Sequence, residues 1–184
     1  MLTSNYFFDR SPNLCLTFRR GCDIMQTHQK GKGRGTMEKM VWFDMDGTIA
    51  DLYGVDGWLL CLRASDPMPY RAARALQPLA ELARELNRLQ AAGWELGVIS
   101  WLARGSSEEY DGAVTKAKRQ WLQRHLPSVV WDNIKIVPYG RNKWEECGCG
   151  ILFDDEQKNR DEWQGTAYPP EEMIAILKRL RKGE

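Results

Sequence analysis

The sequence lacks a long apolar run and a strong excess of charge of either sign. None of its hydrophobic segments approaches the ~20 residues that a membrane-spanning helix needs. Its formal net charge of +1 gives no global reason to expect nucleic acid or an anionic membrane as the main partner. Arg10, Arg19 and Arg20 interrupt the short apolar pieces near the start, which argues against a secretory signal.

Cysteine and histidine are scarce. The five cysteines are odd in number and scattered, which is typical of a reducing compartment rather than of a disulfide framework. Cys147 and Cys149 have no second thiol pair or histidine at zinc-finger spacing, so we expect no structural zinc site. His28 and His125 have no visible partner and are assigned no role. These features together predict a cytoplasmic protein.

The 184 residues fit one domain with an apolar core, preceded by a segment of different character. Residues 1–36 lack hydrophobic periodicity and end in alternating glycine and basic residues at 30–35. Three interpretations stay open: a disordered tail, a stretch upstream of a translation start at Met37, or a basic arm for nucleic acid. The first two are favoured, because such a row more often forms a solvated linker. We therefore expect the folded domain to span residues 37–184.

Within this domain, buried strands alternate with amphipathic helices. Short apolar runs predict strands at 40–43, 94–100, 134–137 and 150–153. Apolar residues at helical spacing, with capping residues and prolines, predict helices at 78–90, 106–125 and 169–180. This alternation predicts an α/β fold with a doubly wound parallel sheet, whose site lies at the carboxyl ends of the strands. The insert at about residues 55–77 is expected to form a small helical cap.

Two carboxylates, Asp44 and Asp46, directly follow the first predicted strand. Residues two apart lie on the same face of a continuing strand, and where the strand ends, the turn opened by Gly47 lets both acids converge on one cation. Such hard oxygen ligands suit Mg²⁺. One carboxylate could also attack phosphorus while its neighbour transfers protons. The less favoured alternative is a surface Asp-Gly turn with a spare acid.

A second acidic pair, Asp154 and Asp155, ends the last predicted strand. Adjacent carboxylates repel one another beside an apolar run unless a cation compensates them. Taken alone, this pair is slightly better explained as a helix cap or a loop. At the same sheet edge as Asp44 and Asp46, it favours a metal site.

A hydroxyl and several cations lie between the acidic pairs. Ser100 ends the second predicted strand, where it could hold a phosphoryl oxygen, although most such serines only cap or turn. Lys143 could neutralise phosphate charge and orient the nucleophilic acid, although lysines are usually solvated. Lys116, Lys118 and Arg119 follow Ser100 on a predicted helix. We interpret these three as a solvated face, with Lys116 as an alternative to Lys143.

The order of these residues resembles the four motifs of the haloacid dehalogenase-like (HAD) hydrolases: Asp-Met-Asp-Gly-Thr at 44–48, a hydroxyl, a lysine and an acidic pair. The resemblance covers residues 40–159 and implies a Rossmann-like core and a Mg²⁺-dependent phosphatase that forms an aspartyl-phosphate. By this likeness, Asp44 would be the nucleophile and a metal ligand. Asp46 would be the general acid/base and would give its backbone carbonyl to the metal.

The same resemblance implies roles for the other motif residues. Ser100 would bind the phosphoryl group, and Lys143 would be its positively charged partner. Asp155, the second acid of its pair, would bind the metal directly. Asp154 would lie next to the direct ligands without binding the metal itself. Asn159 stands where many relatives carry another acid, so the chain departs from the family pattern there.

Within the HAD class, the short insert and the acidic opening at 44–51 are most similar to the 5′-nucleotidase and deoxyribonucleotidase branch. Trp101 and Trp144 flank the proposed phosphate residues and could stack on a base or pack beneath a flap. The expected substrate is a small phosphorylated metabolite such as a nucleotide. Two alternatives stay open: a nucleic-acid end phosphatase that uses the basic tail, and a non-catalytic, metal-binding regulatory relative. The full set of acids, hydroxyl and lysine argues against the second.

Overall fold

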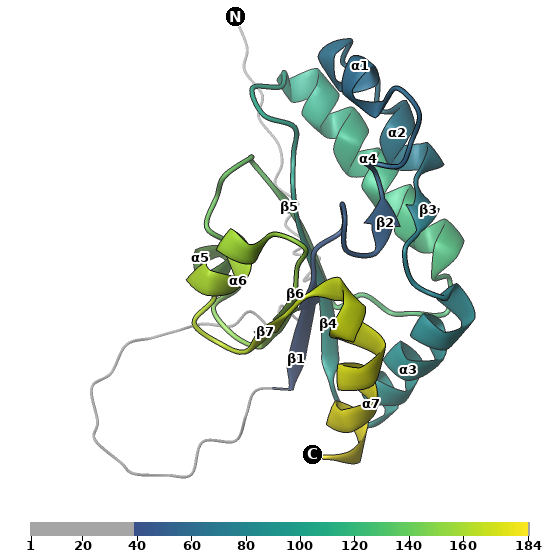
Figure 1. Ribbon diagram of the computed structural model, residues 1–184, viewed down its shortest axis with the longest axis vertical. Coiled ribbons are helices and arrows are strands. Elements are labelled where there is room, and N and C mark those ends of the chain that lie inside the picture. Colours follow the sequence, from purple (N-terminus) through teal and green to yellow (C-terminus); the bar gives the residue numbers. More distant parts are fainter. Residues whose placement is uncertain (1–38, 184) are drawn as a thin grey trace, which may run out of the picture. The chain divides into compact units, whose positions relative to one another are not determined.

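A five-stranded parallel sheet forms the centre of the computed structural model, which describes residues 39–183 (Figure 1). The strand order is β5-β4-β1-β6-β7, and every neighbouring pair is parallel. The strands are β1 (Met40–Phe43), β4 (Glu95–Trp101), β5 (Asn133–Val137), β6 (Ile151–Phe153) and β7 (Ala167–Tyr168). The predicted α/β fold with a doubly wound parallel sheet is therefore confirmed.

Helices cover both faces of this sheet (Figure 1). One face packs against α3 (Leu79–Ala91), α4 (Glu108–His125) and α7 (Met173–Lys182), which follows a short 3-10 helix, η1 (Pro170–Glu172). The other face carries α5 (Lys143–Cys147) and the end of α6 (Gln157–Glu162). Because β1 is buried on both sides, all four of its residues are apolar, which is why its short run predicted a strand.

The insert at residues 55–77, expected to form a helical cap, contains α1 (Trp58–Arg63), α2 (Met68–Ala72) and β3 (Arg74–Ala75). The last of these pairs antiparallel with β2 (Ala50–Asp51), which precedes the insert. Three hydrogen bonds attach the cap to α4, one of them from the Arg124 guanidinium to the Arg71 carbonyl at 3.2 Å. The Tyr110 hydroxyl donates to the Asp66 carbonyl at 3.3 Å, and the Trp121 indole donates to the Ala73 carbonyl at 2.7 Å. The cap is thus held over the end of the sheet that carries the site.

The predictions for residues 1–36, including a disordered tail, a start at Met37 and a basic arm, lie outside the described residues, as does His28. Within residues 39–183, no helix combines the length and the apolar character that crossing a membrane would require.

Candidate active site

Strand register brings the two acidic pairs together. Phe43 at the end of β1 is paired with Phe153 at the end of β6, and the Asp44 amide donates to the Phe153 carbonyl at 2.8 Å. The residues that follow the two strands, Asp44 and Asp154, are therefore neighbours at the carboxyl edge of the sheet. The chain turns to opposite sides of the sheet from β1 and β6, and ligands of open α/β sheets bind at such a point.

A tight turn after Asp44 lets Asp155 approach. Gly47 has φ +82°, a conformation that favours glycine, and a Cβ placed there would lie 2.4 Å from Asp155 Oδ2. The Thr48 hydroxyl, which is buried, lies 3.4 Å from Asp44 Oδ2 and 3.3 Å from Asp155 Oδ1. It also accepts a hydrogen bond from the Asp155 amide at 3.0 Å. The turn and the threonine together hold Asp44 and Asp155 side by side.

Three carboxylates form a compact group that fits a divalent cation. Asp44, Asp154 and Asp155 each offer one oxygen, and these oxygens lie within 4.8 Å of one another. Burial, together with the neighbouring Asp44 and Asp154 charges, raises the pKa of Asp155 to about 7. Burial and Asp44 likewise raise the pKa of Asp154 to about 6, although Lys143 opposes the shift. Repelling hard oxygen donors of this kind suit Mg²⁺ or a similar ion.

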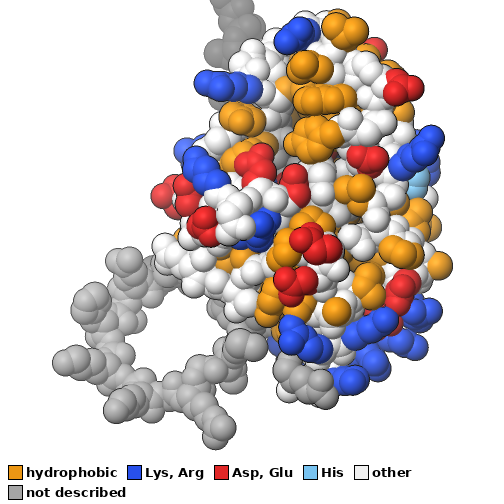
Figure 2. Space-filling model, in the orientation of Figure 1, with side chains coloured by type: hydrophobic (Ala, Val, Ile, Leu, Met, Phe, Trp, Pro, Cys, Tyr) orange, Lys and Arg blue, Asp and Glu red, His pale blue; other side chains and the backbone are white. Residues whose placement is uncertain are grey.

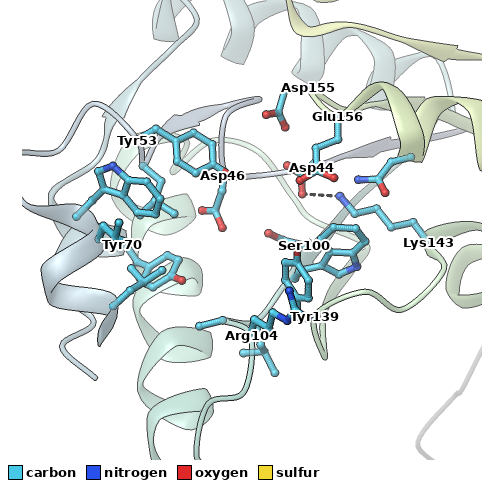
Figure 3. Close-up of a pocket in the computed structure, with 18 residues that line it drawn as sticks. Asp44, Asp46, Tyr53, Tyr70, Ser100, Arg104, Tyr139, Lys143, Asp155 and Glu156 are labelled. Atoms are coloured by element: carbon cyan, nitrogen blue, oxygen red, sulfur yellow. Dashed lines mark hydrogen bonds and ion pairs between the residues drawn. The ribbon is translucent and has the colours of Figure 1, made fainter. Parts of the chain in front are cut away.

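Lys143 lies where the sequence predicted a positively charged partner. It opens α5, and its buried Nζ lies 2.8 Å from Asp44 Oδ1 (Figure 3). The same Nζ lies 2.6 Å from Asp154 Oδ2. Burial acts to lower the pKa of Lys143, but the charges of Asp44 and Asp154 outweigh it and raise that pKa. Lys116, the alternative, is exposed on α4. The geometry therefore favours Lys143 over Lys116.

Lys118 is the site residue that sequence reasoning missed, and its interpretation as part of a solvated face is wrong. Its side chain is fully buried, and Nζ donates to Asp46 Oδ2 at 2.6 Å, to Ser100 Oγ at 2.7 Å and to the Trp101 carbonyl at 2.6 Å. A signal did exist in the sequence. Lys118 lies four residues after Val114 and four before Leu122, on the buried stripe of α4.

The Asp46 carboxylate pairs with Lys118 instead of joining the three-carboxylate group. Burial raises the pKa of Asp46, and the charge of Lys118 opposes this shift. Ser100, fully buried near the end of β4, meets the same lysine. The structure thus brings all six predicted site residues to one edge of the sheet, but their carboxylates do not meet at a single point.

Asn159, the departure from the family pattern, supports Asp154. The buried Asn159 amide donates to both Asp154 carboxylate oxygens, at 3.0 and 3.1 Å. The Glu156 amide donates to Oδ1 at 2.9 Å and Lys143 to Oδ2. Each Asp154 oxygen therefore has two donors. The Asp155 carboxylate, in contrast, accepts a longer bond from Thr48, which leaves it more capacity for a metal ion.

A cavity of about 390 Å³ lies between these polar residues and the cap. Figure 3 shows Asp44, Asp46 and Asp155 around it, with Tyr53 and Tyr70 on one side and Arg104 and Tyr139 on another. Figure 2 shows the same arrangement on the surface, where hydrophobic side chains near α1 gather above acidic ones. The remaining apolar residues that line the cavity are Leu52, Trp58, Leu59, Leu62, Trp101, Leu102 and Ala103.

Of the two tryptophans that could stack on a base, Trp101 lines this cavity. Its indole nitrogen donates to the Arg141 carbonyl at 2.9 Å, and the Lys143 Nζ lies 5.0 Å from its ring. The Trp144 ring instead packs edge-on against Trp163, with ring centroids 5.0 Å apart, on the face of the sheet that carries α5 and α6. Only the first of the two is therefore placed to touch a ligand in the cavity.

Residues 71–175 match the model of a family described as 5′ nucleotidase, deoxy (pyrimidine), cytosolic type C protein (NT5C). The match spans more than half of the chain and includes Ser100, Lys143, Asp154 and Asp155, whereas Asp44 and Asp46 precede it. No curated protein matches the chain.

Among the solved structures that are similar to this chain are two heptose bisphosphate phosphatases. D,D-heptose 1.7-bisphosphate phosphatase from B. bronchiseptica, complexed with magnesium and phosphate, has a TM-score of 0.51 and 16% identity, over 79% of this chain and 99% of that one. D,D-heptose 1,7-bisphosphate phosphatase from Burkholderia thailandensis has a TM-score of 0.45 and 15% identity, over 77% and 97%. The similarity to the first of these structures shows a common fold.

Proposed function

Because the chain belongs to the 5′ nucleotidase, deoxy (pyrimidine), cytosolic type C protein family and is a HAD-like phosphatase, we propose that it hydrolyses a nucleotide monophosphate. We further propose that the reaction depends on Mg²⁺ and passes through an aspartyl-phosphate on Asp44. The observation that carries the proposal is the group of Asp44, Asp154 and Asp155 beside the buried Lys143, at the floor of a cavity with aromatic walls.

The charges of the site support one divalent cation. Before substrate binds, with all four acids ionised, four negative charges face two lysines, which leaves two negative charges to be balanced. Asp44 and Asp155 would hold the ion directly, because Asp154 already accepts two hydrogen bonds on each oxygen. When bound, the ion supplies charge stabilisation for the phosphoryl oxygens.

Four side chains have separate roles in the two steps of the reaction. An Asp44 oxygen attacks phosphorus and forms the acyl-phosphate bond, while the bond from phosphorus to the leaving oxygen breaks and Asp46 protonates that oxygen. Water then attacks the same phosphorus, Asp46 takes its proton, and inorganic phosphate leaves as the Asp44 carboxylate re-forms. Lys143 holds Asp44 Oδ1 in place, and Ser100 donates a hydrogen bond to the phosphoryl group.

The cavity supports a substrate with a flat ring. Its volume falls within the range of about 300–1,000 Å³ typical of small-molecule sites. Tyr53 and Trp58 meet edge-on at 5.1 Å on the cap side, and the half-exposed Tyr139 lies opposite near Arg104. A nucleobase could pack against these aromatic faces while its phosphate reaches the acids below.

A panel of phosphorylated metabolites, measured with Mg²⁺ and with EDTA, tests the proposal. Nucleoside monophosphates should be hydrolysed faster than sugar phosphates, and EDTA should abolish turnover. Asp44→Asn should abolish turnover with the melting temperature retained, because the amide is nearly isosteric but cannot attack phosphorus. Asp56→Asn, at an exposed acid of the cap, is the matched control and should keep wild-type rates.

Undiminished activity after exhaustive metal removal would refute the mechanism. Wild-type turnover by Asp44→Asn would remove Asp44 from the nucleophile role. A clear preference for sugar phosphates would refute only the assignment of the substrate.

A further inference from the structure

Lys118 joins two groups that act on opposite ends of the bond to be broken. Its Nζ contacts Asp46 Oδ2 and Ser100 Oγ, and both of these residues line the cavity. We propose that Lys118 is a positioning residue that fixes Asp46 toward the leaving group and turns the Ser100 hydroxyl toward the phosphoryl group. The proposal rests on the phosphatase reaction proposed above.

The hydrogen bonds of Lys118 leave it no freedom to move. A lysine ammonium has three N–H donors and no acceptor. The three acceptors around it lie at 2.6, 2.7 and 2.6 Å, and the side chain is 0% exposed. A buried cation with all of its donors satisfied is held by its surroundings, since any displacement would leave charge desolvated and unpaired.

This arrangement dictates the direction of the Ser100 proton. Lys118 can only donate, so Ser100 Oγ must accept from it, and the serine's own O–H must point to another acceptor. Ser100 lines the cavity, where a phosphoryl oxygen would be that acceptor. Without Lys118, Ser100 Oγ would lose this donor, and the direction of its O–H would no longer be set.

The same contact orients Asp46. Lys118 occupies Oδ2 at 2.6 Å, so Oδ1 is the oxygen left to exchange a proton with the leaving group and then with water. Lys143 contacts Asp44 and Asp154 instead. The two buried lysines therefore have separate tasks, one at the nucleophile and one at the proton-transfer group.

The cap completes the enclosure of Lys118. The ring of Tyr70, on α2, lies 5.1 Å from Lys118 Nζ, within the range of a cation–π contact. Tyr70 is itself only 3% exposed, so it separates the ammonium group from water. A lysine of α4 thus links the acid/base of the core to the cap that covers the substrate.

Lys118→Met tests this role through its dependence on the leaving group. A nucleoside monophosphate leaves as an alkoxide and needs a proton, whereas p-nitrophenyl phosphate leaves as a stable phenolate and needs little help. General acid catalysis contributes typically 10²–10⁴-fold. Single-turnover release from the nucleotide should therefore fall by about 10²-fold or more, while release from p-nitrophenyl phosphate falls by less than about 10-fold. Lys116→Met, at an exposed lysine of the same helix, should match the wild type on both substrates.

A second comparison keeps the test informative if Lys118→Met does not fold. In Asp46→Asn/Lys118→Met both members of the buried pair are neutral, which avoids an uncompensated charge. If Lys118 acts through Asp46 and Ser100, adding Ser100→Ala to this double variant should leave p-nitrophenol release within about threefold of that of Asp46→Asn/Ser100→Ala. A much slower triple variant would overturn the proposal.

Equal losses on both substrates, or no loss by Lys118→Met, would also overturn the role of Lys118. Wild-type turnover is the reference for all of these comparisons. Its absence on every phosphomonoester, with Mg²⁺ present, would instead refute the proposed function itself and the role of Lys118 with it.

Discussion

Replacing Lys143 by methionine removes a cation from between two acids while keeping most of the side-chain volume. The Lys143 Nζ lies 2.8 Å from Asp44 and 2.6 Å from Asp154, and its side chain is 3% exposed. Removing one partner of a buried ion pair typically costs about 3–5 kcal/mol. Because two carboxylates would then face each other and Asp155 without compensation, we expect the free energy of unfolding in EDTA to fall by about this amount.

Magnesium should reduce this loss. A divalent ion at the same carboxylates would replace the missing positive charge, so the variant should gain more from it than the wild type does. A ligand at 100 times its dissociation constant stabilises the native state by about 2.7 kcal/mol. Urea unfolding of both proteins, in EDTA and in saturating Mg²⁺, measures the two losses separately.

Lys158→Met is the control. The Lys158 side chain is 72% exposed, and its ion pair with Glu162 is long, at 3.7 Å. It should change the free energy of unfolding by no more than about 0.5 kcal/mol in either buffer. An equal loss by Lys143→Met in EDTA and in Mg²⁺ would show that the lysine and the ion do not share carboxylates. A loss below about 1 kcal/mol would contradict the buried pair itself.

Three further outcomes are expected. Asp155→Asn should reduce the Mg²⁺-induced rise in melting temperature more than Asp154→Asn does, and equal rises would contradict Asp155 as the direct ligand. Because the pKa of Asp155 is raised from 3.8 to about 7, the metal-free native state binds extra protons between these values. Its stability in EDTA should therefore fall as pH rises through that interval, while stabilisation by Mg²⁺ should grow; paired thermal melts across pH check this, and a constant difference would count against it. Gly47→Ala should lose the Mg²⁺ response, because its Cβ would lie 2.4 Å from Asp155 Oδ2, whereas Gly93→Ala, with a similar φ of +80° and open space, should keep it.

The sequence by itself determined the parallel sheet and predicted which acids the structure brings together at its carboxyl edge. A strand buried on both faces needs an unbroken apolar run, and β1, β4 and β6 carry one. The edge strand β5 has Lys135 between its isoleucines. The strand β7 and the cap strands β2 and β3 have two residues each, too few to form a recognisable pattern. Asp44 and Asp154 could be predicted to meet, because parallel strands end at the same edge of a sheet.

The tertiary structure alone decided which charges are buried and what they contact. Lys116 and Lys118 are two residues apart on one helix, yet the first is exposed and the second is enclosed. The partners of Lys118 come from distant segments: Asp46 lies 72 positions away and Ser100 lies 18 positions away. A buried charge is tolerated only where such partners converge, and no local pattern records that convergence. For the same reason, the role of Asn159 in supporting Asp154 emerged only once the chain had folded.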